Sequence, residues 1–315
     1  MLRSPHAYRN QLSVVTFGLI CSAVLISPVA AQLRIAPGDW PMYSRDPAGT
    51  RFSPLAQIDT GNVAALELAW SVSVTRSSDD EAGGPSGNPA ATPIVVDGIM
   101  YLPVSGHEVV ALEAASGTEI WRTALPARQG SDARGVAWWP GDGEHGPRIL
   151  VMAGPTLIAL EAANGQLVGD FGRNGVVQVV VPWRGVPVIH DNVAILGAYP
   201  GEINRGLPGD TRAFDVRTGE HVWTFHTVPL PGEVGHDTWL DDGWRNRSGV
   251  NVWAYYMTID DERDLLYMPV SSAAGNYWGG DRPGANLFSN SVVAVDANTG
   301  EYRWHFQTVH HDLWD

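Results

Sequence analysis

One short pattern occurs four times in this chain of 315 residues and constrains its fold more than any other feature. Each copy is an apolar run that ends in an acidic residue, followed by a Ser-Gly, Asn-Gly or Thr-Gly step; the copies occupy residues 110–121, 158–165, 212–223 and 293–304. Their glycines lie 48, 54 and 81 residues apart. Glycine supplies the positive φ that a tight turn needs, so each copy predicts a β-hairpin. In three copies a Trp follows the Gly by four residues, and this large apolar side chain can pack between neighbouring units.

Further strand-like runs precede these hairpins, for example residues 92–102 and 265–270. Each unit therefore contains about four strands, which is the content of a β-propeller blade. Helix signals are nearly absent, and 35 Gly and 22 Pro suit a turn-rich, all-β chain. An ordinary β-sandwich is the alternative, but it gives no reason for the repeated Ala, acid, Gly and Trp.

The first 31 residues have the pattern of a cleaved export signal. Arg3 and Arg9 precede an uncharged apolar run from Leu12 to Ile26, and small residues stand before Gln32. The run is shorter than a membrane anchor requires, and no later run is long enough to cross a membrane. We therefore expect a signal peptide at 1–31, one exported domain at 32–315, and no transmembrane segment in the mature chain.

Charge and cysteine content exclude several classes of function. The net charge is -14, and loss of Arg3 and Arg9 makes it -16. Such a chain is repelled by nucleic acids and anionic membranes. Cys21 is the only cysteine, so the mature chain has no disulfide, no Cys-based metal site and no c-type haem. Lipidation at Cys21 is disfavoured because Ile20 is not the small residue that such a site needs.

The repeat, read as Ala-x-Asp-x-x-Thr-Gly-x-x-x-Trp, resembles the tryptophan-docking motif of the eight-bladed quinoprotein dehydrogenases, which hold pyrroloquinoline quinone (PQQ) and usually Ca²⁺ on the propeller axis. Residues 39–55 are similar to the N-terminal segment of that family, whereas residues 277–284 and 307–315 resemble its glucose and sugar dehydrogenase branch. The resemblance implies an all-β, eight-bladed propeller. The hairpins end near Trp121, Val168, Trp223 and Trp304, and a partial element covers 66–70, so about four blades are expected.

We therefore expect the chain to be the N-terminal half of a longer enzyme. A propeller closes by pairing its first and last strands, and half of one exposes strand edges. Self-association into a closed ring is the alternative.

The resemblance implies a catalytic base and a Ca²⁺ site. Asp315 matches the catalytic Asp of the family, which takes the proton of the substrate hydroxyl, and is expected to lie beside the metal. Glu202 matches the Ca²⁺-binding carboxylate of the family, and oxygen atoms are the ligands that such a hard cation prefers. Ser272 falls where the family has an Asn ligand; its hydroxyl is a weaker ligand, and Asn276 is an alternative.

Four residues are expected to contact the cofactor. Trp253 matches the Trp on which the quinone ring stacks, although one additional residue separates it from Asp260. Arg134 matches the Arg that grips a quinone carboxylate through its planar guanidinium. Arg184 falls where the family has a Ser or Thr facing the cofactor, and His107 precedes a hairpin and is a candidate for the axis.

These features together predict a periplasmic, PQQ-dependent dehydrogenase that oxidises a sugar or alcohol, with a glucose-like sugar favoured. The vicinal cysteines of the alcohol-oxidising branch are absent. Electrons are expected to pass to a quinone or a carrier protein, and His311 and Asp312 to orient the catalytic loop. The segment alone is expected to be inactive. The rival hypothesis is a non-catalytic propeller scaffold of the outer-membrane assembly type, which needs no convergence of Asp315, Glu202, Trp253 and Arg134.

Overall fold

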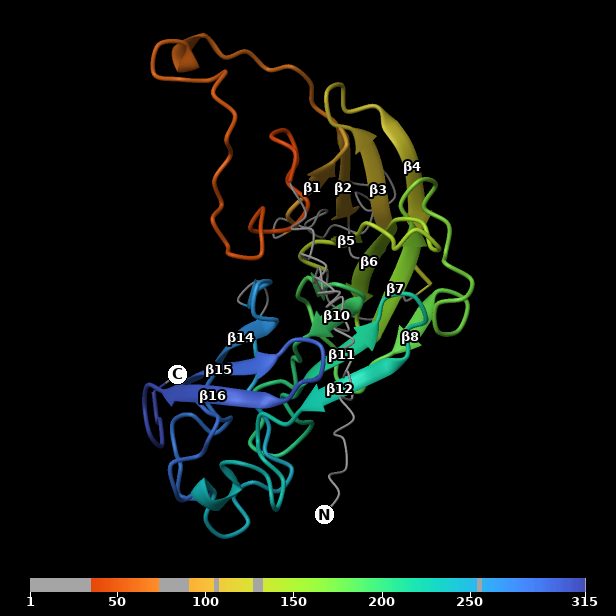
Figure 1. Cartoon of the computed structure of the whole chain (residues 1–315). Helices are drawn as coiled ribbons and strands as arrows, with labels where there is room; N and C mark the ends of the chain where they lie inside the picture. Colours follow the sequence, from red (N-terminus) through yellow and green to blue (C-terminus); the bar gives the residue numbers. More distant parts are fainter. Residues whose placement is uncertain (1–34, 74–90, 105–107, 127–132, 254–256, 315) are drawn as a thin grey trace, which may run out of the picture. The chain divides into compact units, whose positions relative to one another are not determined.

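The computed structural model describes residues 35–73, 91–104, 108–126, 133–253 and 257–314. These residues form four antiparallel sheets of four strands each, and the strands of every sheet are neighbours in chain order (Figure 1). The predicted all-β architecture of about four blades is thereby confirmed. The described residues contain no helix that could cross a membrane.

The strands of each sheet are short and connected in an up-and-down order. The first sheet comprises β1 (Ile94–Val96), β2 (Ile99–Val104), β3 (Glu108–Glu113) and β4 (Glu119–Ala124). The second comprises β5 (Ala137–Trp139), β6 (Arg148–Ala153), β7 (Thr156–Glu161) and β8 (Val176–Gln178). The third comprises β9 (Val188–His190), β10 (Val193–Leu196), β11 (Thr211–Asp215) and β12 (His221–Phe225). The fourth comprises β13 (Thr258–Asp260), β14 (Leu265–Val270), β15 (Ser291–Asp296) and β16 (Tyr302–Gln307).

Two predicted elements differ from the structure. The expected partial element at 66–70 is not a strand, and the helical elements among the described residues are the short 3-10 helices η1 (Val63–Ala65) and η3 (His236–Thr238). In the second sheet the last strand does not follow the turn at Gly165 directly. The chain first makes two isolated bridges, Leu160 to Leu167 and Gly172 to Val176, and β8 starts only at Val176. This hairpin has no Trp after its Gly, so the usual anchor of the last strand is missing.

The repeated Ala and Trp face each other across the last two strands of three sheets. Ala111 is paired with Trp121, and the register then shifts by one residue between Ala111 and Leu112. Equivalent shifts follow the pairs Ala213–Trp223 and Ala294–Trp304. All three alanines are fully buried. A small residue opposite the indole leaves room for the large ring, which explains why the repeat combines these two residue types.

Two of these tryptophans connect one sheet to another. The Trp121 indole N–H donates to the Ala162 carbonyl of the second sheet at 3.0 Å, and the Trp223 N–H donates to the Ala297 carbonyl of the fourth at 3.0 Å. Trp70, which lies outside any strand, makes the corresponding 3.2 Å bond to Ala114. Each acceptor stands three residues before a repeat glycine, so the repeat carries both halves of the contact.

The second and third sheets are joined in another way. A Cβ atom on Gly219 would lie 2.6 Å from a methyl carbon of Val177, where the other repeat glycines meet an indole. The Gly172 N–H also donates to the Thr218 carbonyl at 2.7 Å. The excursion between β7 and β8 therefore replaces the missing Trp by an apolar contact and a backbone hydrogen bond.

Candidate ligand pocket

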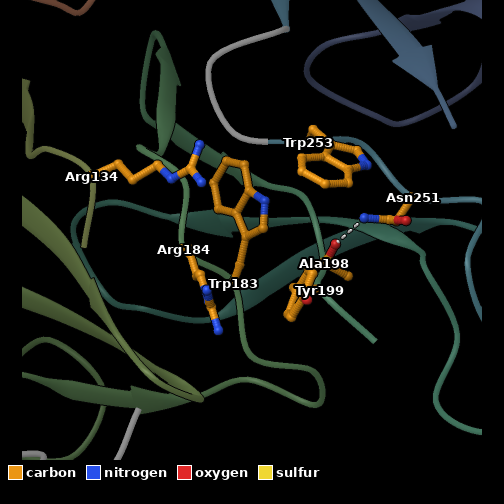
Figure 2. Close-up of a pocket in the computed structure, with 7 residues that line it drawn as sticks. All are labelled: Arg134, Trp183, Arg184, Ala198, Tyr199, Asn251 and Trp253. Atoms are coloured by element: carbon orange, nitrogen blue, oxygen red, sulfur yellow. Dashed lines mark hydrogen bonds between the residues drawn. The ribbon is translucent and has the colours of Figure 1, made fainter. Parts of the chain in front are cut away.

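A pocket of about 230 Å³ lies where segments of the second, third and fourth sheets approach one another. Its lining comes from residues that precede the first strand of a sheet (β5, β9 or β13) or that follow β10. All seven are drawn in Figure 2: Arg134, Trp183, Arg184, Ala198, Tyr199, Asn251 and Trp253. Three of the four residues expected to contact a cofactor, namely Arg134, Arg184 and Trp253, are thus brought to one cavity.

Two indoles supply the apolar surface of the pocket. Trp183 is buried, and its N–H points to the Val252 carbonyl at 3.3 Å. The ring lies so close to the backbone of Gly185 that a Cβ atom there would approach its carbons to 2.2 Å. Trp253 is 45% exposed, so much of its ring remains available to a ligand. A fixed indole beside a partly free one suits the stacking of a flat aromatic molecule.

A buried amide ties two of the lining segments to the residue that follows β14. The Asn251 side chain donates to the Ala198 carbonyl at 2.8 Å, and its oxygen accepts the Ser271 hydroxyl at 3.0 Å. The Ser271 hydroxyl oxygen in turn accepts the backbone N–H of Asn251 at 3.1 Å. Asn251, two residues before Trp253, is therefore held both to Ala198, which follows β10, and to Ser271, which follows β14.

The pocket carries positive charge in a chain whose net charge is -14. The lining contains two guanidinium groups and no carboxylate among the described residues. The Arg134 N–H donates to the Arg184 carbonyl at 3.1 Å, so the two arginines are linked through the backbone. The Arg184 guanidinium carbon lies 4.9 Å from the centre of the Tyr199 ring, a cation–π contact that holds this side chain. Such a lining favours a ligand with carboxylate groups.

The predicted metal ligands and base are not tested by this geometry. Asp315 and His107 lie outside the described residues. Glu202 is exposed three residues beyond Tyr199 and does not line the pocket. The Ser272 carbonyl accepts the Val250 N–H at 2.8 Å, which places this residue beside the Asn251–Ser271 pair. A Ca²⁺ site built from Glu202, Ser272 and Asp315 remains a prediction.

The loop that leads to Asp315 is held by buried side chains. Arg282 is fully buried and donates to the Asp312 carbonyl and, at 2.8 Å, to Asn286. The Asp312 carboxylate accepts the Asn290 side chain at 2.9 Å and the Trp314 N–H at 3.0 Å. The expectation that Asp312 orients this loop agrees with these contacts.

Four-stranded antiparallel units docked through tryptophans, with a cationic and aromatic pocket at the ends of their first strands, define a β-propeller that can hold an anionic aromatic ligand. Residues 40–315 match the family model described as "PQQ: Glucose/ethanol/alcohol dehydrogenase, beta-propeller domain". The chain belongs to this family.

The chain is similar both to glucose dehydrogenases and to alcohol dehydrogenases. It is 33% identical to the quinoprotein glucose dehydrogenase of Escherichia coli (strain K12), covering 93% of the chain and 39% of the relative. It is 34% identical to the quinohemoprotein alcohol dehydrogenase ADH-IIG of Pseudomonas putida, covering 89% and 39%. The solved structure of quinohemoprotein alcohol dehydrogenase from Comamonas testosteroni superposes with a TM-score of 0.73 at 31% identity, covering 88% and 42%. The chain thus spans less than half the length of these relatives.

Four lining residues could not be predicted from the sequence: Trp183, Ala198, Tyr199 and Asn251. Trp183 stands next to Arg184 and Tyr199 three residues before Glu202, but no motif distinguishes these two aromatics from buried blade aromatics. Asn251 stands two residues before Trp253, and its pairing with Ser271 joins positions 20 residues apart. Only the strand register reveals that contact.

Proposed function

We propose that the protein to which this chain belongs is a PQQ-dependent dehydrogenase that oxidises a sugar hydroxyl. The observation that carries the proposal is the convergence of Arg134, Arg184 and Trp253 on one pocket. Each is expected from the family resemblance to face the same cofactor, yet they are spread over more than a hundred residues of sequence. A scaffold without a ligand gives no reason for this convergence.

The residues present suit PQQ, which is flat, aromatic and triply carboxylated. Trp253 offers a half-exposed stacking surface, and Trp183 closes the apolar wall beside it. Arg134 and Arg184 supply cations for the carboxylates. When bound, PQQ accepts the hydride of the substrate carbon. The chain then has to hold the ring, balance its charge and remove the hydroxyl proton.

We assign proton removal to Asp315, with its carboxylate as the general base for the substrate hydroxyl. Arg282 and Asp312 hold the preceding loop, so this base would be supported by buried contacts rather than by a free tail. Glu202 and Ser272 would hold Ca²⁺ through oxygen ligands. Asn276 is the substitute for Ser272 if that loop is shifted.

The preference for a sugar over an alcohol rests on the terminal run 307–315 and the segment 277–284, which resemble the sugar-oxidising branch. The mature chain also has no vicinal cysteine pair. The relatives alone do not decide, since glucose and alcohol dehydrogenases match the chain equally well. Export through the segment 1–31 and transfer of electrons to a quinone or a carrier protein belong to the same proposal.

The test uses the whole protein that contains this chain, supplied with PQQ and Ca²⁺. Dye reduction is measured with a panel of aldoses and a panel of primary alcohols, in the natural protein and in Asp315→Asn. We expect the natural protein to turn over aldoses and Asp315→Asn to lose this turnover. The variant should bind PQQ as tightly as the natural protein. Turnover with alcohols alone would refute the sugar assignment, and failure to bind PQQ would refute the class of enzyme.

A further inference from the structure

A second cluster of ionisable groups lies at the opposite ends of the strands that border the pocket. His190 is the last residue of β9 and Asp191 opens the turn to β10, whereas the turn between β13 and β14 carries Asp261 and Asp264. The pocket residues, in contrast, precede β9 and β13 or follow β10. This cluster is therefore separate from the proposed cofactor site.

His190 joins the third sheet to the fourth through both of its ring nitrogens. Its Nδ1 lies 3.2 Å from an Asp261 oxygen, and its Nε2 lies 2.9 Å from an Asp264 oxygen. The imidazole is 95% buried, whereas both carboxylates are about half exposed. An ionised carboxylate only accepts hydrogen bonds, so each ring nitrogen must be a donor, and both are donors only in the protonated imidazolium.

The local charge favours the same protonation state. Asp191 adds a third carboxylate 4.0 Å from Nε2. Burial by itself lowers the pKa of His190, but the hydrogen bonds to Asp261 and Asp264 and the charge of Asp191 outweigh it, and the pKa is raised. The other charged groups of the facing turn are Glu262 and Arg263, and Arg263 donates to Asp260 at 2.7 Å.

A metal ion would use this geometry less well than a proton. Nδ1 is occupied by Asp261, so a cation would have Nε2, Asp264 and Asp191 as its three ligands, whose atoms lie within 4.8 Å of one another, and it would leave the Nδ1–Asp261 contact unused. Two hydrogen-bond distances on opposite sides of one ring match a bridging imidazolium as they stand.

We propose that protonated His190 is a pH-dependent clamp between the third and fourth sheets. When the proton is lost, one ring nitrogen faces a carboxylate with its lone pair, and one of the two bonds between the turns is replaced by repulsion. The first strands of these sheets, β9 and β13, follow the pocket segments 183–184 and 251–253. The clamp therefore fixes the distance between β9 and β13 at the ends that lie away from the pocket. This proposal does not rest on quinone chemistry.

The test follows His190 and the stability of the whole protein over pH. Histidine-selective NMR should show His190 titrating above the ordinary 6.5, and Asp264→Asn should move that midpoint down. A raised pKa in the folded state gives stability that is complete below the unfolded pKa and is lost as pH rises through the folded pKa. His190→Gln should therefore lower the urea midpoint in mildly acidic solution, and this deficit should shrink as the pH rises.

His221→Gln is the matched control, because His221 is exposed and no carboxylate is among the contacts described for it: its Nε2 lies 2.8 Å from the Thr224 hydroxyl and its ring lies edge-on to Phe214. Its urea midpoint should follow that of the natural protein at every pH. A His190 midpoint at or below 6.5, or a His190→Gln deficit independent of pH, would overturn the clamp. A urea midpoint raised by Zn²⁺ in the natural protein but not in His190→Gln would also overturn it, in favour of a metal site.

Discussion

The Trp121 indole donates to the Ala162 carbonyl of the next sheet and covers Gly165, three residues further along. A Cβ atom on Gly165 would lie 2.5 Å from the indole and 2.5 Å from the Thr123 hydroxyl oxygen. The glycine of the repeat therefore has two functions. It takes the left-handed turn conformation, at a φ of 73°, and it leaves the surface on which the neighbouring Trp docks.

Gly165→Ala should destabilise the protein by about 2–4 kcal/mol, since it combines left-handed backbone strain with overpacking against the indole. Gly98→Ala is the matched control: its φ is 77°, but no atom lies within 4 Å of the added Cβ. That variant should lose only the backbone contribution, about 1–2 kcal/mol. Urea unfolding measures both. Equal losses would show that docking contributes nothing.

Much of the fold was predictable because its repeat encodes both strand pairing and sheet docking. The Ala opposite the Trp, the Gly beneath the Trp of the preceding unit and the acidic residue before the turn are all within one twelve-residue pattern. The second sheet was predicted less well. Its hairpin lacks the Trp, so nothing local indicated that β8 begins at Val176 rather than directly after Gly165.

The site was predictable only where a residue carries its own chemistry. Arg134 and Trp253 offer charge and stacking surface, and each falls at a recognisable place in the family pattern. Asn251 acts through contacts with Ala198 and Ser271, which depend on the register of two sheets. Trp183 resembles any buried Trp until its position between the pocket and Gly185 is known.

The Asn251–Ser271 pair should stabilise both the fold and the pocket. Ser271→Ala removes the donor to a buried amide oxygen and the acceptor for the Asn251 N–H, which should cost about 1–3 kcal/mol. Ser289→Ala is the control, because its hydroxyl is also buried and accepts a backbone N–H, that of Ala273, but outside the pocket. Both variants should lose stability in urea unfolding, but only Ser271→Ala should weaken PQQ binding. Equal PQQ affinities would contradict the role assigned to the pair.

Trp253→Ala should raise the dissociation constant of PQQ by roughly 10- to 100-fold, because the stacking surface is lost. Trp253→Phe keeps a smaller aromatic surface and should stay within about tenfold of the natural protein. Titration of PQQ absorbance measures both. Since Trp253 is 45% exposed, neither substitution should reduce stability as a buried Trp would. If Phe binds no better than Ala, the ring does not stack on residue 253.

Asp142 should stabilise the protein above about pH 4, through a turn that its carboxylate caps, and this contribution should be lost in acid. Its carboxylate accepts the backbone N–H groups of His145 at 2.8 Å and Glu144 at 3.0 Å, and the bond from His145 is the main reason that its pKa is lowered from 3.8 to about 2. A lowered pKa gives stability that is present above pH 3.8 and is lost as pH falls toward about 2. Asp142→Asn should therefore reduce stability at neutral pH and flatten the acid limb of the pH profile.

Asp237→Asn removes the same charge from an exposed site and should leave that limb unchanged. NMR of the Asp142 carboxyl carbon checks the cause directly, because a midpoint near 3.8 would contradict it.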